Sequence, residues 1–442
     1  MTDEFNPLYY NAVDQIYHFE HVAPLLLRLE MLREMIRTLW PDGHPTRVVH
    51  ITGTSGKGSV SRFLEAGLGL RGKAGGLFSP HLFDYRERFS IAGEFASQDD
   101  ILATWEERIK PYCLEVARRR PDFMPMFREI NVLMALALFE QHGVEWAAVE
   151  AGVGARYDHT SAFDAVGAAI TNVGDDHPIE LGPERWMRAL DKAGICRPGK
   201  PLFSAVGDEE SQRVIERVCE ASGSPLIVVT PDYVDGVREA LSGLTASIPH
   251  DGLLGPGHQA WNAALALRIV QHFMPDLPTA EVLEAFAGVR LRGRFEEIQH
   301  GVFIDVAHNV NKISALVAEL ERRFPEDRII FLVGLSKMRQ AGEVLSPILS
   351  IAERVIITMG FHEDRPAEAV RAELEPFNRR SIPLQVIPNP REAFAVARGL
   401  RGDDGLLVIT GSTFLIEQVL NPDPYMRAMN VHYGWRARTR HG

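Results

Sequence analysis

The sequence predicts an α/β protein of two domains, and three observations lead to that prediction. The chain has 442 residues, beyond the size at which one hydrophobic core usually stops growing. A short apolar run at residues 47–51 passes into a glycine-rich loop and then into an apolar stretch with helical spacing. From about residue 296 onward, short apolar runs alternate with amphipathic helical stretches, which is typical of a second sheet covered by helices.

The elements of the first domain follow from apolar periodicity and turn residues. We expect helices at 17–40, 59–70, 130–143 and 256–273 and core strands at 47–51, 145–152 and 165–174. The last two strands end in polar residues. Because ligands bind beyond the carboxyl ends of parallel strands, Glu150 and His177 are expected at the functional edge of this sheet.

The second domain is predicted to be smaller and to have its own sheet. Its expected strands are 301–307, 328–334, 354–360, 384–389 and 405–412, with helices at 311–324 and 390–400. The segment 289–301 is the expected boundary, which gives domains of 1–296 and 297–442.

Composition and charge narrow the class of protein. The chain is 45% hydrophobic and 24% charged, and its formal net charge of −12 disfavours nucleic acids and anionic membranes as partners. Cys113, Cys196 and Cys219 are odd in number and lack metal-ligand spacing, which suits a reducing compartment. With no signal-peptide pattern and no membrane-length apolar run, we expect a soluble, cytoplasmic protein with small-molecule partners. The sequence does not indicate an oligomeric state.

The loop "GTSGKGS" at residues 53–59 has the composition of a phosphate-binding turn. Glycines allow the backbone to approach phosphate oxygens, Lys57 supplies a positive charge, Ser59 suits a magnesium ion, and the following helix directs its N-terminus at the anion. Its spacing differs from the usual P-loop, because Gly58 separates Lys57 from Ser59. On its own it is equally compatible with a glycine-rich turn that carries a surface lysine.

Four further segments carry polar residues that have both a functional and a structural interpretation. Residues 79–93 are either part of a site or a charged surface loop. Glu150 suits a magnesium ligand, or else caps the glycine turn that follows it. His177 is a candidate ligand or a structural histidine, and Lys192 is a candidate site residue or a solvated helix lysine.

Taken together and in order, these segments resemble the Mur ligase superfamily, most closely the branch that contains folylpolyglutamate synthase and dihydrofolate synthase. That branch has the loop G-T-N-G-K-G-S, in which a glycine also separates the lysine from the serine. The unusual spacing of residues 53–59 is therefore a feature of the branch. The further matching segments are "SPHL" with "ERF", "EAGVGARYD", "ITNVGDDH", "KAGICRPGKP", "GHQAWNA", "GRFE", "IDVAHN" and "ITGS". They cover nearly the whole chain.

The resemblance implies a P-loop-type parallel-sheet ATPase domain followed by a smaller Rossmann-like domain. It also implies an ATP- and Mg²⁺-dependent, ADP-forming ligase. Such an enzyme joins an amino acid, expected to be glutamate, to a carboxylate through an acyl phosphate.

The same resemblance implies functional roles for individual residues. The nucleotide-binding positions are Gly53, Thr54, Ser55, Gly56, Lys57, Gly58, Ser59, Gln259, Asn262, Arg294 and Asp305, of which Gln259 and Asn262 match the adenine side. The magnesium-ligand positions are Ser59, Ser79, Glu150 and His177. The catalytic positions are Lys57, Lys192 (the lysine carbamylated in many relatives) and His308, and the amino-acid contacts are His308 and Ser412.

Departures from the family pattern keep the acceptor open. They are Val306, Ala155, Tyr157, His159, Asp175 before the D-H pair, and the absence of an aspartate from residues 334–340. Most of them fall where acceptor or amino acid would be held, so a ligase acting on a non-folate carboxylate is the alternative. A non-catalytic ATP-binding scaffold is disfavoured because the phosphate and magnesium positions are intact together.

Overall fold

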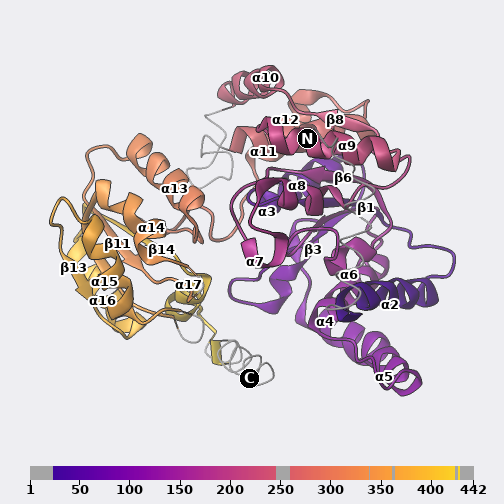
Figure 1. Ribbon diagram of the computed structural model, residues 1–442, viewed down its shortest axis with the longest axis horizontal. Coiled ribbons are helices and arrows are strands. Elements are labelled where there is room, and N and C mark those ends of the chain that lie inside the picture. The colour runs from indigo at the N-terminus through magenta and orange to yellow at the C-terminus, as the bar shows by residue number, and fades with distance from the viewer. Residues whose placement is uncertain (1–22, 245–258, 338, 361–363, 424–426, 429–442) are drawn as a thin grey trace, which may run out of the picture. The chain divides into compact units, whose positions relative to one another are not determined.

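The computed structural model describes residues 23–244, 259–337, 339–360, 364–423 and 427–428, with the side chains of 23–25 left aside. These residues form two compact units (Figure 1), and the chain passes from the first to the second between Val289 and Arg290. The short segment 82–84 groups with the second unit. Two α/β units confirm the predicted fold class, whereas the ranges 1–296 and 297–442 stay a prediction.

The first unit is built on a mixed sheet of eight described strands. Its strands are β1 (Arg47–Thr52), β2 (Ala74–Leu77), β3 (Phe89–Ile91), β4 (Glu94–Phe95), β5 (Trp146–Glu150), β6 (Ala165–Ile170), β7 (Leu202–Ser204) and β8 (Leu226–Val228). Their order is β4-β3-β2-β5-β1-β6-β7-β8, and all pairs from β2 to β8 in that order are parallel. Strands β1, β5 and β6 are therefore central, and their carboxyl ends lie side by side.

Helices cover both faces of this sheet. The helices of the first unit are α2 (Ala23–Leu39), α3 (Lys57–Leu68), α4 (Gln98–Ala103), α5 (Lys110–Arg119), α6 (Phe127–Gln141), α7 (Pro178–Leu181), α8 (Arg185–Ala193), α9 (Glu209–Ser222), α10 (Pro231–Ser242), α11 (Gln259–Phe273) and α12 (Thr279–Ala287). Shorter helical turns lie at Gly69–Arg71, Tyr85–Arg88 and His159–Ala162, with a π-helical turn at Thr104–Ile109.

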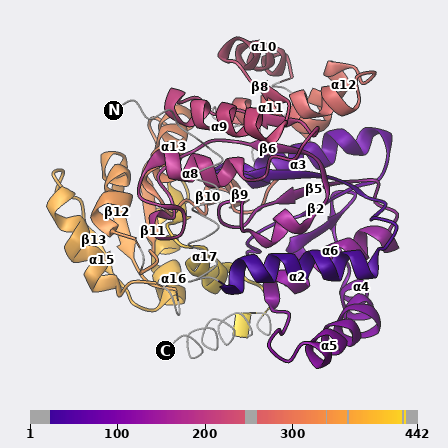
Figure 2. The ribbon, with the colours of Figure 1, turned by 45° about the vertical axis from the view of Figure 1, so that its right-hand side comes forward.

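Alternation of side chains along the strands determines which helices pack on which face. Val48 and Val149 belong to the core that α2 and α6 close, while Phe203 of β7 meets Phe273 of α11, with ring centroids 6.2 Å apart. Figure 2 shows α2 and α6 along one side of the sheet and α11 along the other. Gly67 of α3 allows close packing, because a Cβ there would lie 2.8 Å from Val270 of α11.

The second unit has a sheet of six described strands with helices on both faces. Its strands are β9 (Glu296–Gln299), β10 (Val302–Ile304), β11 (Ile329–Val333), β12 (Ala352–Ile357), β13 (Leu384–Val386) and β14 (Leu406–Thr410). The order is β13-β12-β11-β14-β10-β9, and only the edge strand β9 pairs antiparallel.

The helices of the second unit are α13 (Val310–Arg323), α14 (Ala341–Leu345), α15 (Ala367–Leu374), α16 (Pro390–Arg401) and α17 (Thr413–Leu420), with turns at Ser346–Ser350 and Glu375–Phe377. Phe331 packs with α13 to α15, and its neighbour Leu332 packs with α16 and α17. Among the described residues of the whole chain, no helix is both long and apolar enough to cross a membrane.

Candidate active site

The glycine loop follows β1 directly and leads into α3, as predicted. Gly53 and Gly56 have φ of 149° and 83°, conformations that favour glycine. Helix α3 begins at Lys57, and no side-chain hydrogen bond caps its N-terminus. The first N–H groups of an α-helix have no partner within the helix, so this end of α3 presents donors suited to an anion.

The loop after β6 fixes the shape of the glycine loop. Oδ1 of Asn172 accepts hydrogen bonds from the backbone N–H groups of Thr54 (3.1 Å) and Ser55 (2.9 Å). The N–H of Gly174 donates to Oγ1 of Thr54 at 2.9 Å, and Thr171 Oγ1 donates to the Ser55 carbonyl at 2.5 Å. We did not predict a role for Asn172; its position just after a strand next to β1 was the available signal.

Residues from α11 close against the same loop. Nε2 of Gln259 donates to Oγ of Ser59 at 3.2 Å, and Nδ2 of Asn262 donates to Oε1 of Gln259 at 2.7 Å. Nζ of Lys57 donates to the Gly53 carbonyl at 2.9 Å. The structure therefore brings together the loop and the two residues of α11, which lie beside Ser59 and Gly56.

Glu150 and Ser79 meet at the carboxyl ends of β5 and β2. Glu150 is the last residue of β5 and is 7% exposed, and its Oε2 accepts a hydrogen bond from the N–H of Ser79 at 3.2 Å. Ser79 itself is half-buried. Two of the predicted magnesium ligands are thus in direct contact at the expected edge of the sheet.

His177 lies in the loop that follows β6. Its φ of 55° is unusual for a residue other than glycine, and its side chain is half-buried. Nδ1 is 3.6 Å from Oε2 of Glu180, and Nε2 is 3.9 Å from Oδ1 of the buried Asp176. The imidazole therefore lies beside two carboxylates.

Lys192 is buried, so the interpretation as a solvated helix lysine is wrong. It is only 2% exposed, in the last turn of α8. Burial, and then the positive charge of Lys57, lower the pKa of Lys192 to about 8, while Asp191 and Asp176 raise it. Oδ1 of Asp191 also accepts a hydrogen bond from the N–H of Ala155 at 2.7 Å, which ties α8 to the turn after Glu150.

The remaining predicted residues belong to the second unit and gather at the carboxyl ends of β10 and β14. Asp305 accepts hydrogen bonds from the N–H groups of Phe295 (2.9 Å) and Ala307 (2.8 Å), and Nη1 of Arg294 donates to the Gly293 carbonyl at 3.4 Å.

His308 and Ser412 are held by contacts within the second unit. Nδ1 of His308 is 2.8 Å from the Val306 carbonyl, and its Nε2 is 3.4 Å from Nζ of Lys312. Oγ of Ser412 donates to Oδ1 of Asp364 at 2.7 Å and caps α17. Asp364 is 1% exposed, and the sequence pattern did not reveal it.

The donor set suits a magnesium ion that a phosphate helps to hold. Among the described residues, no three His, Cys, Asp or Glu side chains gather closely enough to hold a metal ion. Mg²⁺ usually takes one or two carboxylates together with water and substrate phosphates, rather than a closed protein cage. The buried carboxylate of Glu150 beside a phosphate-type loop fits that pattern.

Comparison with known proteins identifies relatives of this chain. Residues 293–413 match the family described as Mur ligase, glutamate ligase domain. The chain is 30% identical over 429 residues to the dihydrofolate synthase/folylpolyglutamate synthase of Mycobacterium tuberculosis, covering 89% of this chain and 86% of that protein. It is 26% identical to a probable bifunctional folylpolyglutamate synthase/dihydropteroate synthase of Haloferax volcanii, covering 88% of this chain and 47% of that longer protein.

A solved structure extends the likeness to three dimensions. A Mycobacterium tuberculosis folylpolyglutamate synthase, complexed with ADP and AMPPCP, superposes with a TM-score of 0.77 at 26% identity, covering 91% of this chain and 97% of that one. The chain therefore belongs to the folylpolyglutamate synthase and dihydrofolate synthase family of ATP-dependent, ADP-forming ligases that make a carbon–nitrogen bond.

Proposed function

We propose that this protein uses ATP to join glutamate to the carboxylate of a folate-type acceptor. The observation that carries the proposal is the carboxyl edge of the first sheet. There the 53–59 loop follows β1, buried Glu150 ends the neighbouring strand β5, and buried Lys192 of α8 lies near enough to Lys57 for the two charges to interact. The relative at 30% identity, named dihydrofolate synthase/folylpolyglutamate synthase, supports the choice of glutamate and of a folate acceptor.

The first step is phosphoryl transfer to the acceptor. An oxygen of its carboxylate attacks the γ-phosphorus of ATP, ADP leaves, and an acyl phosphate forms. The N–H groups at the start of α3 and the Lys57 ammonium would bind the β- and γ-phosphates. Lys57 now donates to the Gly53 carbonyl 2.9 Å away, so its charge already lies at the mouth of the loop.

The second step forms the amide. The glutamate amine attacks the acyl carbon, phosphate leaves, and the nitrogen loses a proton. Within the second unit, His308 and Ser412 are the proposed contacts for the amino acid, and Arg294 and Asp305 the proposed contacts for the nucleotide. Oγ of Ser412 donates to buried Asp364 and accepts from the N–H of Leu415, so these two contacts fix the orientation of the hydroxyl.

Magnesium would be held by Ser59, Ser79, Glu150 and His177 together with phosphate oxygens. When bound, it supplies positive charge that offsets the charge developing on the transferred phosphoryl group. The Ser79 N–H orients Glu150 through its bond to Oε2. Lys192, whose pKa is about 8, carries a fraction of neutral amine near pH 8, the form that carbamylation requires.

A non-folate carboxylate is the second candidate acceptor. His159, one of the departures from the family pattern, is 7% exposed, and its Nε2 lies 3.2 Å from Oε1 of Glu129. Glu129 is fully buried and also accepts from Nε of Arg28 at 2.5 Å. This buried polar network joins α2 and α6 to the helical turn His159–Ala162, at a position that departs from the family pattern, and that departure is the reason for keeping a second acceptor.

A product assay tests the proposal. Purified protein is incubated with Mg²⁺–ATP, each amino acid and a panel of carboxylates that includes dihydropteroate and reduced folates, and products are identified by mass spectrometry. The expected result is a pterin acceptor heavier by one glutamate residue, with ADP released, and product formation about 100-fold slower with Lys57→Ala. ADP formed only with another carboxylate would overturn the folate assignment, and no ADP with any pair would overturn the ligase assignment.

A further inference from the structure

We propose that Arg188 and Asp175 form a latch that positions the loop carrying Asp176 and His177, and that Arg188 is thereby a positioning residue for metal binding. This inference rests on the proposed function, because His177 is there a proposed magnesium ligand. The loop runs from Gly174, just after β6, to Pro183, just before α8.

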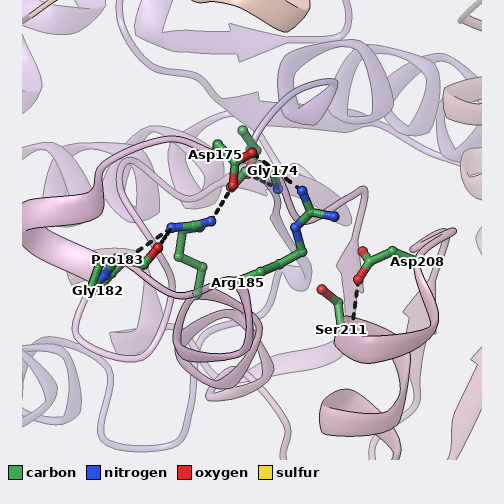
Figure 3. Close-up of polar contacts among 9 residues, drawn as sticks. Gly174, Asp175, Gly182, Pro183, Arg185, Asp208 and Ser211 are labelled. Atoms are coloured by element: carbon green, nitrogen blue, oxygen red, sulfur yellow. Dashed lines mark hydrogen bonds and ion pairs between the residues drawn. The ribbon is translucent and has the colours of Figure 1, made fainter.

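Arg188 makes contact with both ends of this loop. From the first turn of α8, its Nη2 donates to Oδ1 of Asp175, while its Nη1 donates to the carbonyls of Gly182 (3.0 Å) and Pro183 (2.9 Å). Figure 3 labels Asp175 at the beginning of the loop and Gly182 and Pro183 at its end, with dashed lines for these contacts. One planar guanidinium thus joins the beginning of the loop to its end.

The loop from Gly174 to Pro183 also contacts the glycine loop at residues 53–59. The N–H of Gly174 donates to Oγ1 of Thr54 in the glycine loop at 2.9 Å. Asp175 is the next residue, and Asp176 and His177 follow, with the His177 N–H donating to Oδ1 of Asp176 at 3.1 Å. The latch therefore holds the segment between the phosphate loop and His177.

His177 needs such support because of its backbone. Its φ of 55° and ψ of 50° place it in the left-handed region, which is costly for a residue with a Cβ and persists only where the surroundings hold it. The Leu181 N–H donates to the His177 carbonyl at 2.9 Å within the short helix α7. Arg188 fixes the residues immediately beyond that turn.

Two arginines contact Asp175, and they differ in burial. The Arg188 side chain is 4% exposed, whereas that of Arg185 is 41% exposed and lies 3.4 Å from Oδ2 of the same carboxylate. Exposed ion pairs contribute little, whereas loss of a buried partner leaves polar groups unsatisfied. Arg185, which Figure 3 also labels, is therefore a matched control for Arg188.

Asp175 supplies the acceptor of the latch and is one of the departures from the family pattern. It stands where the resembled family has an apolar residue before the D-H pair, and its side chain is 66% exposed. An apolar residue cannot accept the guanidinium hydrogen bond.

The first test is hydrogen–deuterium exchange of the peptide covering residues 175–183, without metal or nucleotide. Arg188→Met and Asp175→Ala, each of which removes the hydrogen bond between the two side chains, are expected to speed exchange there by about tenfold, while Arg185→Ala leaves it near the wild-type rate. This measurement needs no acceptor, so it tests the latch even if the proposed function fails. Unchanged exchange in both Arg188→Met and Asp175→Ala would overturn the latch.

The second test measures Mn²⁺ affinity in the presence of ADP by titration calorimetry. Arg188→Met is expected to weaken Mn²⁺ binding by about tenfold, as loss of a supporting contact does at other metal sites, with ADP affinity in the absence of metal unchanged. Arg188→Lys restores part of the loss, and Asp175→Ala serves if Arg188→Met does not fold. Wild-type Mn²⁺ affinity in the folded variants would overturn the positioning role, whereas no Mn²⁺ binding by the wild type would refute the proposed metal site instead.

Discussion

A Cβ atom placed on Gly56 would lie 2.3 Å from Oδ1 of Asn262. The two residues are distant in sequence, yet α11 closes so tightly on the glycine loop that only a hydrogen fits between them. Asn262 is in turn bonded to Gln259, whose Nε2 reaches Oγ of Ser59. The contact therefore links the shape of the loop to the position of a proposed magnesium ligand.

Gly56→Ala is expected to weaken ADP binding by about tenfold, because the left-handed backbone costs an L-residue about 1–2 kcal/mol and Asn262 must also move. Titration calorimetry with ADP measures the change. Gly43→Ala is the matched control, since Gly43 has a similar φ of 88° but no atom within 4 Å of an added Cβ. Equal ADP affinity in the two variants would show that the Asn262 contact has no influence on the nucleotide.

Lys57→Ala is expected to lower kcat by about 100-fold, the scale on which single charge-stabilising groups act in catalysis, while the fold is retained. The Lys57 ammonium lies at the loop and would neutralise charge on the transferred phosphoryl group. ADP release measures the rate, and circular dichroism the fold. Lys73→Ala, at an exposed lysine, serves as the control. Full activity of Lys57→Ala would refute the role.

Glu150→Gln is expected to raise the Mg²⁺ concentration for half-maximal activity by about tenfold. Glutamine retains an acceptor for the Ser79 N–H but removes the charge that a hard cation prefers. Glu145→Gln, an exposed residue just before the same strand, is the control. An Mg²⁺ titration that coincides with that of the wild type would exclude Glu150 as a magnesium ligand. If only the KM for the acceptor rose, Glu150 would instead have a role in acceptor binding.

Local sequence patterns were sufficient for the fold and for the glycine loop. Apolar runs such as 145–152 and 165–174 correspond to β5 and β6, and the helix predicted at 59–70 corresponds to α3, because burial on both sides of a parallel sheet leaves continuous apolar strands. The strands β2, β3, β4, β7, β8 and β9 were not predicted. Each spans only two to four residues, which leaves little room for a periodic pattern.

Side-chain partners from distant elements could not be read from the sequence. Asn172 bonds to a residue 118 positions away, and Gln259 to Ser59, 200 positions away. Burial of Lys192 is likewise a property of tertiary packing, which is why a helical lysine was compatible with solvent exposure. The resemblance identified positions, whereas the contacts that hold them required the structure.

Buried Lys192 gives the protein a pH dependence whose sign can be derived. Its pKa is about 8 in the folded chain against 10.5 for a free lysine, so between these values the unfolded chain binds more protons than the folded one. The free energy of unfolding of the wild type, relative to that of Lys192→Met, should therefore rise with pH across this window, by up to about 1.4 kcal/mol per pH unit. Urea unfolding at several pH values from 7 to about 10 measures the difference.

The charge of Lys57 supplies a second, independent check of the same prediction. It is the largest cause of the lowered Lys192 pKa after burial, so Lys57→Ala should shift the pH window upward, toward the pKa of a free lysine. Lys200→Met, at an exposed lysine, should leave the window in place. If the wild type and Lys192→Met differ by a constant free energy at every pH, Lys192 keeps an ordinary pKa, and a neutral amine near pH 8 is not available for carbamylation.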